Sequence, residues 1–90
     1  MKNFYTINYK LYESRKSEET LLDVQIVDLA YKSRENAFKA VQERIKTHIE
    51  LGDYKRTFSS FAIETDESKS GQKFRIEYEI KEHWLSDYEI

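Results

Sequence analysis

Hydrophobic and polar residues alternate in two segments, one near each end of the chain. In residues 3–12 the odd positions from Tyr5 onward are apolar, and in residues 73–81 the even positions are apolar: Tyr5, Ile7, Tyr9 and Leu11, then Phe74, Ile76, Tyr78 and Ile80. In a strand, successive side chains point to opposite faces, so a period of two places all apolar residues on one face. Each segment is therefore predicted to be a half-buried β-strand.

Two further strand-like segments carry apolar residues on both parities. They are residues 20–31, with Val24 and Ile26 against Val27 and Leu29, and residues 54–65, with Phe58 against Phe61 and Ile63. A β-bulge near Ile26–Val27 and a phase slip at Ser59–Ser60 would each restore a single buried face. The alternative is that both faces are covered, the second one by another subunit.

A helix is predicted over residues 34–51. Its apolar residues recur at offsets of three and four, namely Phe38, Val41, Ile45 and Ile49. Ser33 is a favourable N-cap, and Glu35 lies in the first turn, where the helix dipole stabilises an acid. Gly52 stands just beyond the end, as is common after a helix C-terminus.

These segments give the order ββαββ. The predicted fold class is α+β, an antiparallel four-stranded sheet packed on one face by a single helix (residues 34–51). Charged residues 13–19 are predicted to be a mobile hairpin connection, and polar residues 66–71 a turn that ends at Gly71. Residues 1–90 are taken as one domain, with residues 82–90 as a C-terminal extension.

Composition restricts the chemistry that the chain can support. It has no cysteine, so disulfides and thiolate sites are excluded. Neither a membrane-spanning apolar run nor a signal peptide is evident, and a cytoplasmic location is expected. With Gly52 and Gly71 as the only glycines, no glycine-rich phosphate loop exists. We expect no cofactor and no metal.

An enzyme is not expected, because no catalytic motif is present. His48 is interpreted as a residue on the flank of the helix, favoured by the dipole at its C-terminus, and His83 as a solvated strand residue. The enzymatic alternative is a small nuclease-like protein that uses one histidine with a nearby Glu, Arg or Tyr.

Nucleic-acid binding is the main non-enzymatic alternative to protein binding. The candidate residues are basic: Lys10, Arg15, Lys16, Lys55 and Arg56. Against it, the net charge is -2, and the polar face of residues 73–81 alternates Lys73 and Arg75 with Glu77 and Glu79. Mixed charge weakens the long-range attraction to phosphate on which such binding relies.

Protein binding is the function that the sequence favours. The C-terminal run mixes aromatic and acidic residues, and its candidate contacts are Glu82, Trp84, Asp87 and Tyr88. An open sheet also offers two edge strands to a partner, and apolar residues on both parities are compatible with a homodimer. No membrane partner is expected.

The overall residue usage is rich in Lys, Glu, Ile and Tyr, with no Pro and no Cys. It is similar to that of short proteins of AT-rich bacteria and of their phages and plasmids. This resemblance implies a phage or mobile-element protein that inhibits a host factor, of the anti-CRISPR or anti-restriction type.

Overall fold

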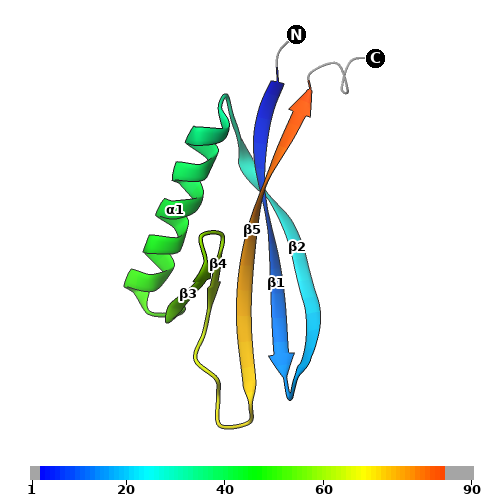
Figure 1. The fold of residues 1–90 in the computed structure, drawn as a ribbon, viewed down its shortest axis with the longest axis vertical. Helices are drawn as coiled ribbons and strands as arrows, with labels where there is room; N and C mark the ends of the chain where they lie inside the picture. The colour runs from blue at the N-terminus through cyan, green and yellow to red at the C-terminus, as the bar shows by residue number, and fades with distance from the viewer. Residues whose placement is uncertain (1–2, 85–90) are drawn as a thin grey trace.

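The computed structural model describes residues 3–84, without the side chains of residues 28, 56 and 58, and shows an antiparallel sheet with one helix packed against it (Figure 1). The elements are β1 (Asn3–Arg15), β2 (Glu18–Tyr31), α1 (Arg34–Leu51), β3 (Arg56–Ser59), β4 (Ala62–Glu64) and β5 (Gln72–Trp84). The strand order is β2-β1-β5-β4-β3. The predicted α+β class and the ββαββ order are confirmed, but the sheet has five strands and not four.

The core forms where α1 packs against the two central strands. In the β1–β5 register, Ile7 faces Ile80, Tyr9 faces Tyr78 and Leu11 faces Ile76, so the odd positions of β1 and the even positions of β5 share one face. The buried cluster combines that face with the helix stripe: Ile7, Val27, Ala37, Val41, Ile45, Ile63, Ile76 and Tyr78. The alternation in the two end segments thus identified the face that packs against the helix.

Helix α1 begins and ends where its capping residues predict. The Ser33 side chain accepts a hydrogen bond from the Asn36 amide at 3.1 Å, which satisfies one of the unpaired N–H groups of the first turn. Gly52 has a φ of 82°, and its amide donates to the carbonyls of His48 and Ile49. This left-handed backbone suits glycine, because a Cβ atom is disfavoured there.

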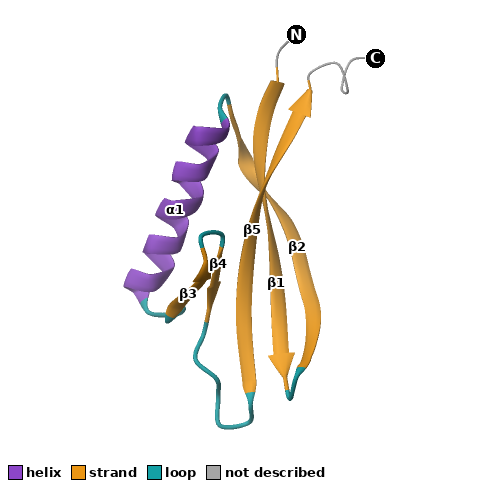
Figure 2. Ribbon diagram, viewed as in Figure 1, coloured by secondary structure: helices purple, strands orange, loops and turns teal. Residues whose placement is uncertain are grey.

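The predicted third strand is instead a tight hairpin of β3 and β4 (Figure 2). The expected phase slip at Ser59–Ser60 is a chain reversal. Side chains satisfy backbone groups at this reversal: Gln42 Nε2 donates to the Ser60 carbonyl at 2.7 Å, and Ser59 Oγ accepts from the Phe61 amide at 3.2 Å. The reversal therefore depends partly on a contact with the helix, which the local sequence does not reveal.

The connection between β1 and β2 is much shorter than the predicted segment 13–19. Only Lys16 and Ser17 form the turn, with φ values of 48° and 70°, the signs that a two-residue type I′ hairpin turn requires. The flanking charged residues continue the strands, and Ser14 pairs with Glu19 and Arg15 with Glu18. The prediction of a mobile loop over residues 13–19 is therefore wrong.

The molecule is elongated, with extents of 52 × 26 × 18 Å and a radius of gyration of 15.3 Å. A compact domain of this length would have a radius of gyration of roughly 12 Å. The cause is a mismatch of lengths, because the 18-residue helix spans about 27 Å whereas the 13-residue β1 spans about 43 Å. Strand β5 also includes residues 82–84, the first part of the predicted extension.

Candidate functional site

Strand β2 forms one edge of the sheet and carries an unusual number of exposed apolar side chains. Among the described residues, five of the eight exposed large hydrophobic side chains lie on this single strand, which we call the β2 apolar row: Leu21, Leu22, Val24, Ile26 and Leu29. Their exposed fractions run from 47% to 66%. Because β2 has only β1 as a neighbour, its outer edge also presents unpaired backbone donors and acceptors.

The centre of the row lies on the sheet face that points away from the helix. Val24 pairs with Lys10 and Ile26 with Asn8, both at even positions of β1, whose odd positions pack against α1. Figure 1 shows β2 as the outermost strand of the sheet, on the side opposite to the β3–β4 hairpin. The row therefore combines an open strand edge with apolar side chains.

The predicted bulge near Ile26–Val27 is present, but it does not bury the row. Between the Ala30–Thr6 and Ile26–Asn8 pairs, β2 has three residues where β1 has only Ile7. A second irregularity falls at Leu22. The first bulge turns Val27 into the core, where it is 8% exposed, yet Leu29 remains 59% exposed. The bulge explains why apolar residues occur on both parities of β2. It does not explain why the side chains of the β2 apolar row remain exposed.

A charged cluster fixes the hairpin end of the same outer face. Arg75 donates to both carboxylate oxygens of Glu19, at 2.6 and 2.9 Å, and its guanidinium lies 4.7 Å from the centre of the Tyr12 ring. The hydrogen bonds to Glu19 raise the pKa of Arg75. The bidentate ion pair and the cation–π contact hold β5, β2 and β1 in register at this end of the sheet. The strand that carries the β2 apolar row is therefore held in place here.

The predicted C-terminal contact residues are placed only in part. Glu82 accepts hydrogen bonds from Asn3 Nδ2 and the Tyr5 hydroxyl, both at 2.8 Å. The hydrogen bond from Tyr5 to Glu82 raises the pKa of Tyr5. Trp84 is 44% exposed at the end of β5. Asp87 and Tyr88 lie outside the described residues. The Glu82 carboxylate is thus engaged within the chain, next to the start of β1.

The basic residues proposed for nucleic-acid binding occupy three separate places. Lys10 lies in the middle of β1, 3.9 Å from Glu79 Oε2. Arg15 and Lys16 lie at the β1–β2 turn, and Arg15 is 3.8 Å from Glu13. Lys55 directly precedes β3 and Arg56 is its first residue, beyond β5 and β4 in the sheet. These residues do not form one continuous basic surface.

Each histidine has partners within the chain. His48 Nδ1 is 3.2 Å from Asp53 Oδ2, and this hydrogen bond lowers the pKa of Asp53. A depression of about 250 Å³ beside it is lined only by residues of α1, Glu43, Arg44, Thr47 and His48. His83 stacks on Phe4 and lies 2.7 Å from Thr6 Oγ1, so it is more enclosed than the predicted solvated position. Within residues 3–84, no three metal-ligating side chains converge.

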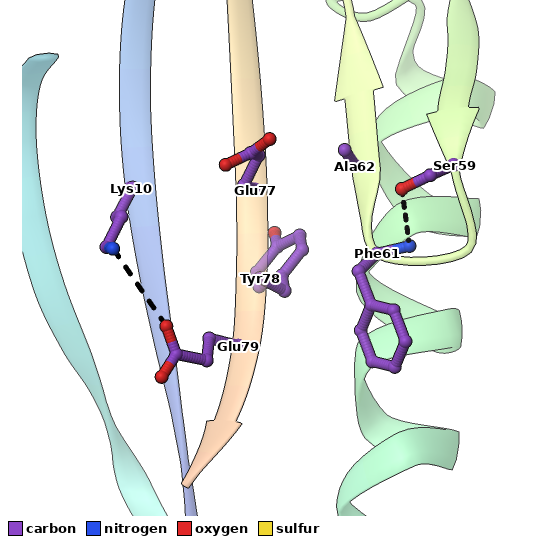
Figure 3. A pocket seen from close by; sticks show the side chains of 7 residues that line it. All are labelled: Lys10, Ser59, Phe61, Ala62, Glu77, Tyr78 and Glu79. Atoms are coloured by element: carbon purple, nitrogen blue, oxygen red, sulfur yellow. Dashed lines mark hydrogen bonds and ion pairs between the residues drawn. The ribbon is translucent and has the colours of Figure 1, made fainter.

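A second hollow, of about 270 Å³, lies between β5 and the β3–β4 hairpin (Figure 3). The pairing of β4 with β5 ends at Ala62 and Glu77. One further hydrogen bond joins the Tyr78 amide to the Phe61 carbonyl at 2.7 Å. Lys10, Glu77 and Glu79 surround the opening, and Lys10 forms an ion pair with Glu79. Its charged groups are already paired within the chain or open to solvent, so its lining identifies no ligand.

The sequence analysis placed its named contact residues at the C-terminus, and for residues 20–31 it left open a bulge or cover by another subunit. The signal that could have found the β2 apolar row was present, because apolar residues on both parities of residues 20–31 require a second cover or a bulge. The structure shows that the bulge covers one of them. No protein-family model, curated protein or solved structure matches this chain. Within the described part, no helix has the length and apolar character needed to cross a membrane.

Proposed function

We propose that this chain is a non-enzymatic protein-binding module, and that it binds through the edge of β2 and the β2 apolar row. The observation that supports the proposal is the concentration of exposed Leu, Val and Ile side chains on one edge strand. Exposed apolar residues are ordinary when scattered, but a contiguous group marks an interaction surface.

Strand addition is the mode of binding that fits this surface. A partner strand that pairs with β2 would satisfy its outward backbone groups, and these hydrogen bonds would fix the direction of the partner. Side chains of the same partner face would cover Val24 and Ile26 and remove them from water. Each square ångström of apolar surface covered contributes about 25 cal/mol, before the cost of association is subtracted.

A module of this size acts by occupying a surface of its partner. In this proposal the biological effect is stoichiometric regulation or inhibition of that partner. The residue usage, similar to that of phage and plasmid proteins, favours a host factor as the target. Inhibition of the anti-CRISPR or anti-restriction type is the specific form of this proposal.

Affinity capture from a host lysate, after nuclease treatment, tests the proposal. Ile26→Lys adds one positive charge in the centre of the row, opposite the uncharged Asn8. Leu51→Lys is the matched control, because it makes the same charge change at a side chain that is 74% exposed at the end of α1. We expect wild type and Leu51→Lys to retain the partner, and Ile26→Lys to weaken its binding at least tenfold. Equal capture by the two variants, or loss of capture on nuclease treatment, contradicts the proposal.

A further inference from the structure

We infer that the strand paired with the β2 edge is β2 of a second copy of this chain, in an antiparallel arrangement about a two-fold axis at Gln25. This inference rests on the proposed function: a second copy occupies the same β2 edge in the free protein, and a host factor that pairs with β2 displaces that copy. The argument uses three properties of β2: the positions of its two bulges, the order of its acidic and apolar residues, and the length of the opposite edge strand.

Symmetry first restricts the pairings that two identical strands can make. In a two-fold dimer the same surface serves both copies, so each residue pair occurs twice, once in each direction. If the axis is perpendicular to the sheet, the two helices lie on the same side and the two outer faces become continuous. Directly opposed residues then share a face, and the axis passes midway between the two copies of one β2 residue.

The bulges select Gln25 as that residue. The irregularities in the β1–β2 pairing fall at Leu22 and at residues 27–29. An axis at Gln25 places Leu22 opposite residue 28, so the two irregular stretches face each other and the segment between them pairs without interruption. An axis at Val24 or Ile26 would instead place Leu22 opposite Ile26 or Ala30, against regular strand.

The order of side chains supports the same register. With the axis at Gln25, Val24 of one copy faces Ile26 of the other, twice, and these are two exposed residues of the outer face. Strand β2 has four acidic residues and no basic one, yet in this register Asp23 faces position 27 and not another acid. An axis at Asp23 would place Asp23 opposite itself.

The other edge of the sheet limits the assembly to two copies. Strand β3 has four residues, whereas β2 has 14. A short edge strand offers few backbone groups for pairing, so a sheet joined at β2 ends at a β3 edge on both sides. The symmetric contact uses the same edge of both copies and closes on itself.

A single cysteine tests the register directly, because the chain has none of its own. Opposed Cα atoms in antiparallel strands are about 4.5–5.5 Å apart, within the range that a disulfide bridges. Under mild oxidation, Gln25→Cys should therefore form a covalent dimer at least tenfold faster than Leu51→Cys, an exposed control on α1. Asp23→Cys should behave like the control, because this register separates the two copies of residue 23 by four positions.

Light scattering and salt separate this inference from the proposed function. We expect wild type to be a dimer, Ile26→Lys to be a monomer with an unchanged circular dichroism spectrum, and dimerisation to strengthen with added salt, which screens two acidic strands. A wild-type monomer at high concentration, or equal cross-linking of Gln25→Cys and Leu51→Cys, overturns the second-copy inference. If Ile26→Lys then still abolishes capture of another protein, the proposed function stands; if it does not, both fail.

Discussion

His48 and Asp53 form a polar pair where α1 ends. The imidazole lies edge-on to the Tyr54 ring, with 5.2 Å between ring centres, while Nδ1 faces the Asp53 carboxylate. The hydrogen bond from His48 is the main cause of the lowered pKa of Asp53. Since this bond favours the ionised carboxylate, it couples the protonation of one surface residue to folding.

Acid titration of Asp53→Asn measures this coupling. A carboxylate whose pKa is lower in the folded state stabilises that state fully above its ordinary pKa, and the contribution is lost as the pH falls through the lowered pKa. We therefore expect wild type to be more stable than Asp53→Asn at neutral pH, and the difference to shrink on acidification below the ordinary range for Asp. Urea unfolding at a series of pH values provides the test. A difference that does not vary with pH would show that the carboxylate charge is unimportant.

Elements defined by local chemistry were predicted well from the sequence. Helix α1 runs over residues 34–51, as expected, because Ser33 and Gly52 act within one turn of its ends. The segment 54–65 was predicted as one strand because its reversal depends on Gln42, which lies 18 residues before Ser60 and meets it only after folding. The two-residue turn was missed for another reason: Lys16 and Ser17 adopt positive φ values without a glycine to signal them.

Ser33→Ala tests the local origin of the helix boundary. The substitution removes the acceptor for the Asn36 amide, and loss of such an N-cap costs about 1 kcal/mol of folding stability. Urea denaturation should show this loss with an unchanged dependence on denaturant concentration. Ser33→Asp keeps an acceptor at the same place and should stay close to wild type. If both variants lose equal stability, the cap is not the cause.

At the scale of the whole molecule, a thin core and an exposed edge have a common origin. One helix of about 27 Å covers only part of one face of a longer sheet. The helix therefore cannot bury all the apolar side chains of β2. Apolar residues at both even and odd positions of residues 20–31 indicated that one face could not bury them all. The sequence did not identify which of these side chains remain exposed. That outcome depends on where the bulges fall: they bury Val27 and leave Val24, Ile26 and Leu29 exposed.

Ile63→Ala and Ile26→Ala separate the two roles of isoleucine in this molecule. Ile63 is fully buried in β4, and truncation of such a residue costs about 2–5 kcal/mol. That is a large part of the roughly 5–13 kcal/mol expected for a domain of this length. Ile26 is 66% exposed, so its truncation should change the stability of the monomer by less than about 0.5 kcal/mol.

Concentration makes this comparison decisive. If β2 pairs with a second copy, wild type gains stability as protein concentration rises, because the dimer binds only folded chains. Ile26→Ala should then fall further below wild type at high concentration, whereas the loss in Ile63→Ala should already be present at low concentration. Thermal unfolding over a hundredfold range of concentration measures both effects. A deficit in Ile26→Ala that does not grow with concentration would place this side chain outside any self-association surface, while a small deficit in Ile63→Ala would contradict the core described above.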